Sequence, residues 1–260
     1  ILQNPLNPPI DNLADLCRNL NIPILYIEPF MKGDNYYIFD PAGAPYTNSV
    51  YLKDILKEDV SNLCKHELTT RLAQPSEITL NELVNKYQIE NLDLEKTIIC
   101  LGQVSTDKSI KKSPLNLNYY EWWKLLIDSN PDVLFLIKKH PLDNDELLDP
   151  MHFTNKNVII IDESIYSLGK IFNFFASYSS TTILELVSMY KKVITGGYHF
   201  FEGQEVCLET TDFNNILDKL NNIELDTLKI DSIIHNIFTK YIKELGSEEL
   251  GIFLLENSTK

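Results

Sequence analysis

The sequence predicts an α/β protein with parallel strands, and residues 97–141 carry most of that prediction. Thr97–Leu101 is apolar and β-branched, as a buried strand should be, and Val133–Ile137 repeats the pattern. Between them, Tyr119–Ile127 has the apolar spacing of an amphipathic helix, and the sequence Asn130-Pro131 ends it. A strand, a helix and a strand joined this closely predict parallel pairing with a right-handed crossover.

The same alternation is expected on both sides of this stretch. Before it, we predict a helix over Leu13–Leu20, a short strand over Ile24–Ile27 and a strand over Tyr36–Phe39. After it, the expected strands are Asn157–Ile161, Ile171–Ala176 and Val193–Thr195, and the expected helices are Thr182–Tyr190, Asp212–Leu220 and Ile230–Leu245. A charged connector ends near Lys96, so we predict an N-terminal domain of residues 1–96 and a second domain of residues 97–260, whose last helix can cross back.

Composition excludes several classes of function. The 260 residues carry a net charge of −14, which argues against nucleic-acid binding and against electrostatic docking on anionic lipid. The four cysteines are scattered and form no CxxC pair, so we expect reduced thiols, a cytoplasmic location and no zinc site. No apolar run approaches the ~20 residues of a spanning helix. The first residue is Ile1 and not Met, so we expect a piece of a larger protein.

Polar residues follow the two strands that flank the predicted crossover. Gln103 and Asp107 come after the first strand, and Lys138, His140 and Pro141 end the second. Open α/β sheets bind their ligands at this carboxyl edge. By pattern alone, Asp107 is more often a cap or a solvated loop acid than a nucleophile or base. Lys138 with His140 fits a phosphate site and a purely structural role equally well.

A second polar cluster begins the helix predicted over residues 182–190. Ser179 and Ser180 are good helix caps, and hydroxyl and free N–H groups at such a position also bind phosphate. Glu185, one turn later, is placed to accept hydrogen bonds from sugar hydroxyls or to complement the helix dipole. His199 is a further candidate to flank a ligand, although Gly196-Gly197 before it also fits a simple turn.

Taken in order, these motifs resemble those of the bacterial capsule-type β-Kdo transferases, which use CMP-Kdo, an activated 3-deoxy-octulosonic acid. The likeness spans residues 26–204. Its parts are the acidic strand end at Glu28, the QxxxD loop from Gln103 to Asp107, the KxHP strand end of Lys138, His140 and Pro141, the serine pair with the later Glu185, and Gly197 with Phe200 and Phe201. The chain departs from the family in having Glu28-Pro29-Phe30 where Glu-Asp-Gly is usual, and Ile183 where a glycine is common.

The resemblance implies a GT-B-like fold, with two Rossmann-like halves, parallel sheets and a central cleft. The N-terminal half would face the acceptor in abbreviated form, and the second half would bind the donor. It also implies no metal and no cofactor besides the CMP-Kdo donor, and a glycan or glycolipid acceptor. The location it implies is cytoplasmic, with a peripheral position at the inner face of the bacterial membrane as the alternative.

The resemblance also implies roles for the candidate residues. Asp107 would be the nucleophile of a retaining reaction that passes through a covalent ester, with Gln103 orienting it. Glu28 would deprotonate the acceptor hydroxyl. The donor side would use Lys138 and His140 for the CMP leaving group, Ser179 and Ser180 for its phosphate and Glu185 for ribose.

Three alternatives stay open. A bacterial sialyltransferase also carries an HP pair and serines, and it would use Asp107 as a base in an inverting reaction. A CDP-glycerol-type polymerase has a similar KxHP strand end and serine pair. The third alternative is a non-catalytic sugar- or nucleotide-binding module of a larger capsule protein. The choice of donor and the slow hydrolysis of CMP-Kdo separate these possibilities.

Overall fold

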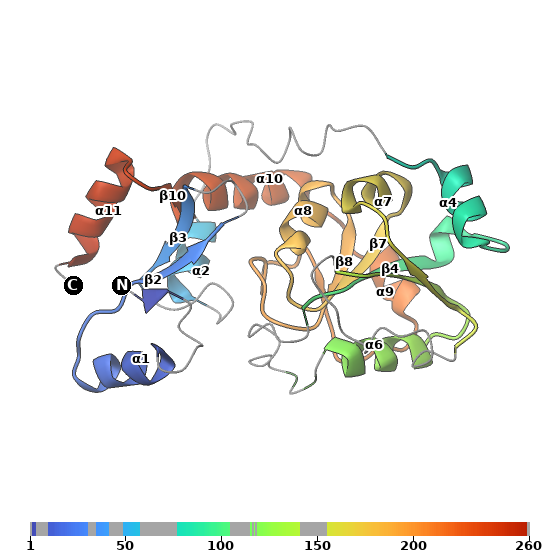
Figure 1. Ribbon diagram of the computed structural model, residues 1–260, viewed down its shortest axis with the longest axis horizontal. Helices are drawn as coiled ribbons and strands as arrows, with labels where there is room; N and C mark the ends of the chain where they lie inside the picture. The colour runs from blue at the N-terminus through green and yellow to red at the C-terminus, as the bar shows by residue number, and fades with distance from the viewer. Residues whose placement is uncertain are drawn as a thin grey trace. The chain divides into compact units, whose positions relative to one another are not determined.

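The computed structural model describes residues 2–3, 10–30, 35–41, 49–57, 77–104, 115, 117, 119–140 and 155–258 (Figure 1). The chain forms two compact units, one of Ile1–Glu67 with Asp231–Lys260 and the other of Leu68–Ile230. The boundary expected near Lys96 therefore lies inside the second unit. The reason is α4 (Leu80–Tyr87), which packs on that unit: Lys86 pairs with Glu163 at 2.6 Å, and the Tyr87 hydroxyl donates to the same carboxylate at 2.8 Å.

The second unit contains the predicted parallel sheet. Its six strands run in the order β6-β5-β4-β7-β8-β9, and every neighbouring pair is parallel. The strands are β4 (Thr97–Leu101), β5 (Leu134–Lys138), β6 (Val158–Ile161), β7 (Phe174–Ser177), β8 (Lys192–Thr195) and β9 (Leu208–Glu209). After β4, the chain adds β5 and then β6 on one side of that strand. It then returns to form β7 on the other side of β4, and β8 and β9 follow beyond β7. The β4–β7 boundary is thus the topological switch point, where sheets of this kind bind ligands.

Helices cover both faces of this sheet. Figure 1 shows α6 (Tyr119–Asp128) on one side and α7 (Ile165–Ile171) and α8 (Thr182–Ser188) on the other. The remaining elements are a 3₁₀ turn (Leu94–Lys96), α9 (Ile216–Asn221) and the start of α10 (Thr227–Asn236). Trp122 of α6 is fully buried and packs edge-to-face on Tyr178 and Phe213, with ring centroids 5.6 and 6.0 Å away. This aromatic cluster lies beneath the loops that leave β7 and β9.

A parallel sheet was predicted for each half of the protein, and the sheet of the first unit is mostly antiparallel. Its four strands, in the order β1-β2-β3-β10, are β1 (Leu2–Gln3), β2 (Tyr26–Pro29), β3 (Tyr36–Asp40) and β10 (Ile242–Glu244). Only β1 and β2 are parallel, and the other two pairs are antiparallel. The expectation was wrong here because residues 30–35, between β2 and β3, are too few for a crossover helix and allow only antiparallel pairing.

The predicted helix over Ile230–Leu245 is also wrong in its second half. Helix α10 ends at Asn236, a π-helical turn follows over Ile237–Tyr241, and the chain then leaves as β10, with Ile242 opposite Ile38. The backbone N–H and C=O groups of Ile242–Glu244 pair with the edge of β3 in place of the intrahelical hydrogen bonds that a longer helix would make. The buried Tyr241 hydroxyl donates to the Asp40 carboxylate at 2.6 Å and ties this turn to the sheet.

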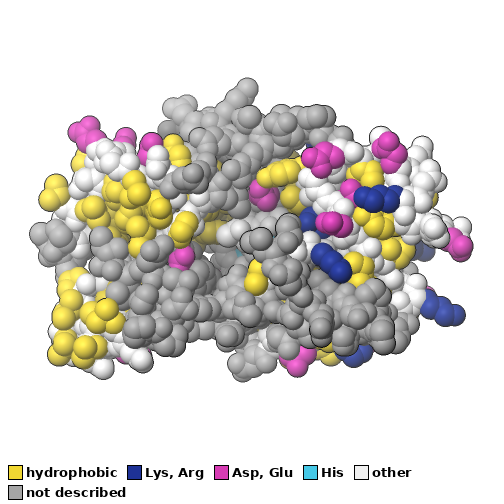
Figure 2. All heavy atoms as spheres, viewed as in Figure 1, with side chains coloured by type: hydrophobic (Ala, Val, Ile, Leu, Met, Phe, Trp, Pro, Cys, Tyr) yellow, Lys and Arg dark blue, Asp and Glu magenta, His cyan; other side chains and the backbone are white. Residues whose placement is uncertain are grey.

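Within its described residues, the first unit also contains α1 (Ile10–Asn19), α2 (Val50–Leu56) and α11 (Glu248–Ser258). Phe253 of α11 packs on Phe39, with ring centroids 6.3 Å apart. Leu13 and Leu16 of α1 and Leu20 after it are exposed. Figure 2 shows hydrophobic side chains gathered at this end of the unit.

Candidate functional site

The switch point of the large sheet is spanned by Gln103 and Ser179. Gln103 follows β4 and is only 3% exposed, whereas Ser179 follows β7 in the next strand of the sheet. The Gln103 Oε1 atom accepts a hydrogen bond from the Ser179 backbone N–H at 2.8 Å. The Gln103 Nε2 group donates to Ser179 Oγ at 3.3 Å. Gln103 and Ser179, two candidates from separate sequence motifs, are therefore directly hydrogen-bonded to each other.

Gly102 brings the ends of β4 and β5 together. Its N–H donates to the Lys138 carbonyl at 2.8 Å. A Cβ atom at this position would lie 2.8 Å from both the backbone nitrogen of His140 and the carbonyl oxygen of Lys138. Only glycine fits at this distance, and its presence places the Lys138 and His140 backbone beside the strand that leads to Gln103.

Lys138 and His140 supply basic groups at this edge. Both are partly exposed, and Lys138 Nζ donates to the Lys139 carbonyl at 3.1 Å. Burial lowers the pKa of Lys138, while the nearby carboxylates of Asp162 and Glu163, beyond β6, act in the opposite direction. An anionic ligand here would reinforce the protonated form of the lysine.

The residues of the serine-rich turn and of α8 have different hydrogen-bond partners. Ser180 Oγ accepts from the Thr182 backbone N–H at 3.2 Å and donates to Thr182 Oγ1 at 2.9 Å, so Ser180 serves the start of α8. Glu185 is buried in α8, and the Tyr166 hydroxyl of α7 donates to it. The structure therefore gives both Ser180 and Glu185 structural partners. Neither lies in the contact that joins Gln103 to Ser179.

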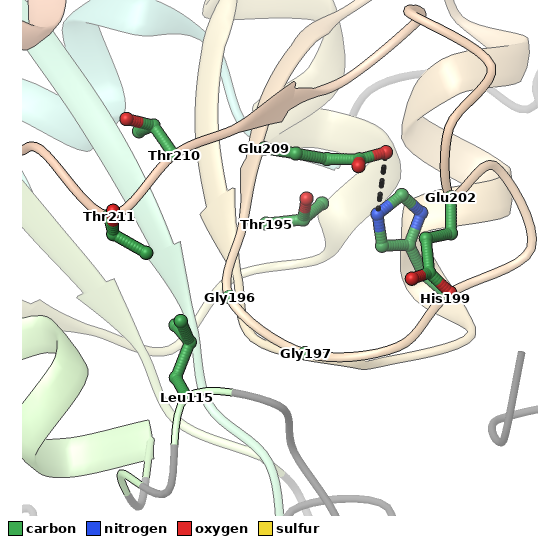
Figure 3. A pocket seen from close by; sticks show the side chains of 9 residues that line it. All are labelled: Leu115, Thr195, Gly196, Gly197, His199, Glu202, Glu209, Thr210 and Thr211. Atoms are coloured by element: carbon green, nitrogen blue, oxygen red, sulfur yellow. Dashed lines mark ion pairs between the residues drawn. The ribbon is translucent and has the colours of Figure 1, made fainter.

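A cavity of about 240 Å³ opens beside Ser179, at the ends of β8 and β9 (Figure 3). The Tyr178 carbonyl accepts from the N–H groups of both Gly196 and Gly197, at 3.2 and 2.6 Å, which makes the turn after β8 tight. A Cβ atom on Gly197 would lie 2.9 Å from the Ser179 Cβ, so one wall of the cavity touches the serine. The polar lining comprises Thr195, His199, Glu202, Glu209, Thr210 and Thr211.

His199, a candidate from the sequence, belongs to this lining. Its side chain is 1% exposed, its Nδ1 atom accepts from the Phe201 N–H at 3.2 Å, and its Nε2 atom lies 3.6 Å from Glu209 Oε1. Burial lowers the pKa of His199 to about 3. No sequence motif indicated Thr195, Glu202 or the run Glu209–Thr211, because these three places in the chain meet only when β8 and β9 pair.

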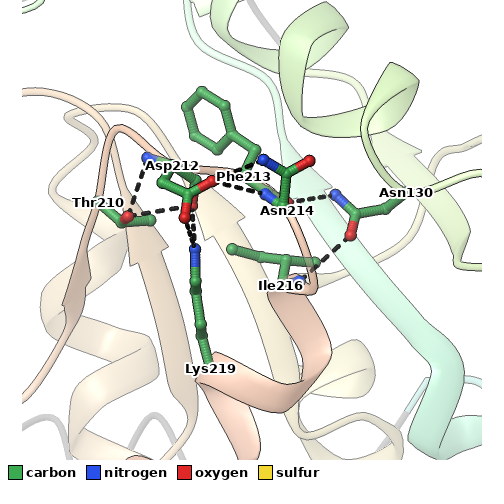
Figure 4. Close-up of polar contacts among 7 residues, drawn as sticks. All are labelled: Asn130, Thr210, Asp212, Phe213, Asn214, Ile216 and Lys219. Carbon is green, nitrogen blue, oxygen red and sulfur yellow. Dashed lines mark hydrogen bonds and ion pairs between the residues drawn. The ribbon is translucent and has the colours of Figure 1, made fainter.

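A buried asparagine holds the loop that carries Thr210 (Figure 4). The Nδ2 group of Asn130, after α6, donates to the carbonyls of Leu126 and Phe213, both at 2.8 Å, and its Oδ1 accepts from the Ile216 N–H at 3.2 Å. Nearby, Lys219 Nζ donates to the Asp212 carboxylate at 2.6 Å. This hydrogen bond and those from Asn214 lower the pKa of Asp212 to about 2. These contacts connect α6 to the floor of the pocket.

The other predicted residues lie elsewhere. Asp107 and Pro141 lie outside the described residues. Glu28 is partly exposed and lies within β2, opposite Ile38 of β3, in the first unit; the prediction placed it just after the strand.

In the described ranges, no three His, Cys, Asp or Glu side chains form a group suited to a metal ion. No helix in the described part of the chain is long and apolar enough to cross a membrane.

Comparison with known proteins yields structural matches. No family model and no curated protein matches the sequence. One solved structure, described as the β-Kdo 2,7 transferase of Thermosulfurimonas dismutans KpsC, is 21% identical and superimposes with a TM-score of 0.58 over 96% of this chain and 90% of that chain. The β-Kdo 2,4 transferase of the same KpsC is 16% identical, with a TM-score of 0.58 over 92% of this chain and 78% of that chain.

These matches agree with the parallel sheet described above and extend over both units of the chain. The α/β, GT-B-like fold class is therefore confirmed, and the resemblance to capsule-type β-Kdo transferases holds at the level of the fold.

Proposed function

We propose that this chain is a glycosyltransferase that moves Kdo from CMP-Kdo to a surface-glycan acceptor with retention of configuration. The observation that carries the proposal is the bonded pair Gln103–Ser179 at the switch point, with Lys138 and His140 on the adjacent strand end. The fold shared with two β-Kdo transferases supports it. With a net charge of −14, the chain needs a local basic group to hold an anionic donor, and this edge has one.

On the donor side, Lys138 and His140 would neutralise charge on the departing CMP. The Ser179 hydroxyl would hold its phosphate, with Ser180 beside it and Glu185 toward ribose. Burial lowers the pKa of Lys138, and a phosphate nearby would raise this pKa again and gain a strong interaction with the ammonium group. The position of the Ser179 backbone, fixed by Gln103, would keep this contact in place through the reaction.

The reaction would proceed in two displacements. In the first, the Asp107 carboxylate attacks the anomeric carbon, the bond to the CMP phosphate breaks, and CMP leaves with its electron pair. In the second, Glu28 takes the proton of an acceptor hydroxyl, the alkoxide attacks the same carbon, and the ester bond to Asp107 breaks. Two inversions give net retention and restore the carboxylate of Asp107.

A donor screen tests this function. The full chain is mixed separately with CMP-Kdo, CMP-sialic acid and CDP-glycerol, and the release of nucleotide is measured with and without glycan acceptors. We expect turnover with CMP-Kdo, including slow hydrolysis without acceptor. Turnover confined to either of the other donors would replace the assignment, and binding of CMP-Kdo without any turnover would identify a non-catalytic module.

Intact-protein mass spectrometry with peptide mapping tests the covalent step. We expect an adduct of the mass of Kdo on Asp107, and loss of transfer by at least ~10²–10⁴-fold in Asp107→Asn. The exposed Asp132, in the loop before β5 at the amino end of the sheet, offers a control. Asp132→Asn should retain transfer, whereas an adduct on another residue would remove Asp107 from this role.

A further inference from the structure

The cavity beside Ser179 is lined by the buried side-chain atoms Thr195 Oγ1 and His199 Nε2. Thr195 Oγ1 and His199 Nε2 are both buried, and within the described part of the chain neither has a hydrogen-bond partner. Buried polar atoms are nearly always satisfied, by protein, water or ligand. Both residues line the same cavity, so a molecule bound there would satisfy them together.

The hydrogen bonds of His199 define what its free nitrogen offers. Because Nδ1 accepts from the Phe201 N–H, the proton of the neutral ring must sit on Nε2. Burial lowers the pKa of this histidine to about 3, so the ring is neutral at physiological pH. The Nε2–H group points toward Glu209 Oε1, 3.6 Å away, which is too far for a direct hydrogen bond (Figure 3). Glu209 Oε1 also accepts from the Gly203 N–H at 2.8 Å, so the carboxylate is held in place.

This arrangement selects for the chemistry of a hydroxyl group. A hydroxyl can accept from His199 Nε2–H and donate to Glu209 at the same time. An ammonium group cannot accept a hydrogen bond, and a carboxylate or a fully ionised phosphate cannot donate one. Glu202 and Glu209 also line the cavity and disfavour an anion there.

We propose that the pocket formed by Thr195, His199 and Glu209 binds a hydroxyl group of an uncharged, polyhydroxylated part of a ligand. At about 240 Å³ the cavity is smaller than the ~300–1,000 Å³ pockets that hold whole drug-sized ligands, so it suits one part of a larger substrate. Its Gly197 wall approaches Ser179, next to the proposed phosphate position. Naming the source rests on the proposed function: the hydroxyl belongs either to the hydroxylated tail of the donor sugar or to an acceptor sugar.

The binding test uses D-glucitol as an uncharged probe and D-gluconate as its anionic counterpart. The full chain, whose five histidines are labelled with ¹⁵N, is titrated with each, and the His199 Nε2 resonance is assigned with His199→Gln. We expect a saturable shift with glucitol and a markedly weaker response to gluconate. Absence of a saturable shift with glucitol, or equal binding of both probes, would overturn the proposal.

Thr195→Val removes the hydroxyl and keeps the shape of the side chain. We expect this variant to bind glucitol about three- to tenfold more weakly, as for one lost hydrogen bond. Thr97→Val, at the amino end of the same sheet, is the matched control and should bind glucitol as the parent does. Unchanged glucitol binding by Thr195→Val in a folded protein would contradict the assignment.

Calorimetry with nucleotides separates the two sources of the hydroxyl. If it belongs to the donor sugar, Thr195→Val weakens the binding of CMP-Kdo and leaves the binding of CMP unchanged. If it belongs to the acceptor, both nucleotide affinities stay unchanged and the acceptor KM rises. Glucitol binding in a chain that does not bind CMP would refute the proposed function and leave this pocket assignment standing.

Discussion

The side chain of Gln103 makes two hydrogen bonds to Ser179, one to the Ser179 backbone N–H at 2.8 Å and one to the Ser179 hydroxyl at 3.3 Å. These bonds cross the β4–β7 boundary, where the order of the strands reverses. The two residues are neighbours in space because β4 and β7 pair directly, with Leu101 opposite Ser177. A neutral amide suits this position, since it satisfies the backbone donor without placing a negative charge beside the proposed phosphate site.

Replacing Gln103 by Met should loosen the loop after β7. Methionine has a similar length and offers no comparable hydrogen bond, so the partly buried N–H of Ser179 loses its partner. We expect a loss of ~1–3 kcal/mol of unfolding free energy and weaker CMP binding, measured by urea denaturation and calorimetry. Ser179→Ala keeps the 2.8 Å backbone bond and should lose less stability; equal losses would show that the backbone contact is unimportant.

Gly102→Ala should displace the end of β5. The new Cβ would meet two backbone atoms at 2.8 Å, and backbone cannot move aside as a flexible side chain can. We expect a destabilisation of ~1–3 kcal/mol and a lower CMP affinity, because Lys138 and His140 shift together. In the control Gly251→Ala, within α11, the Cβ meets nothing within 4 Å. That variant should gain up to ~1 kcal/mol from helix propensity, so equal effects of the two changes would refute the argument.

Asn130→Asp should destabilise the second unit. A carboxylate cannot donate to the carbonyls of Leu126 and Phe213, so two buried hydrogen bonds are lost and a charge is buried. The expected cost is ~2–3 kcal/mol in unfolding free energy. Asn214→Ala, an exposed change in the same network, should stay within ~0.5 kcal/mol. A similar small effect for Asn130→Asp in denaturant melts would contradict this assignment.

The loss of folding stability in acid should depend in part on Asp212, in the loop after β9. Its pKa is lowered from 3.8 to about 2 in the folded protein by Lys219 and Asn214. The unfolded chain therefore binds a proton more readily, and the contribution of Asp212 to stability is present above pH ~4 and lost as the pH falls toward 2. Asp212→Asn should flatten the fall in stability over this range, and Lys219→Met should do the same in acid-unfolding curves. Curves that coincide with that of the parent chain would exclude this role.

Glu28→Gln should separate acceptor chemistry from donor binding. Glu28 lies in the first unit, whereas Gln103, Lys138 and Ser179 lie in the second. We expect CMP affinity to stay at the parent value while transfer falls by ~10²–10⁴-fold, as for loss of a positioned base. Loss of CMP binding in a folded variant would place Glu28 in the donor site instead.

The sequence alone predicted five of the six strands described in the large parallel sheet, although β7 begins at Phe174 and not at Ile171, and β9 was not predicted. Strand β4 was predicted at its observed residues, Thr97–Leu101, because a fully buried strand reads as an uninterrupted apolar run. Helix α6 was predicted to within one residue, because its amphipathic spacing is followed by a stop signal at Asn130-Pro131. Since these signals are local, they also placed Gln103 correctly after β4. Ser179 was predicted as a helix cap, whereas it follows β7 and Thr181 is the residue that precedes α8.

Only the tertiary structure decided which distant segments meet. Ile242–Glu244 has no strong strand signal of its own, and it becomes β10 because the edge of β3 offers it hydrogen bonds. Thr195, His199 and Glu209 come from the ends of β8 and β9 and the loop between them, and they line one pocket because those two strands pair. Local sequence encodes whether a segment is a strand or a helix, whereas pairing between remote segments depends on the burial and hydrogen bonding available once the whole chain has folded.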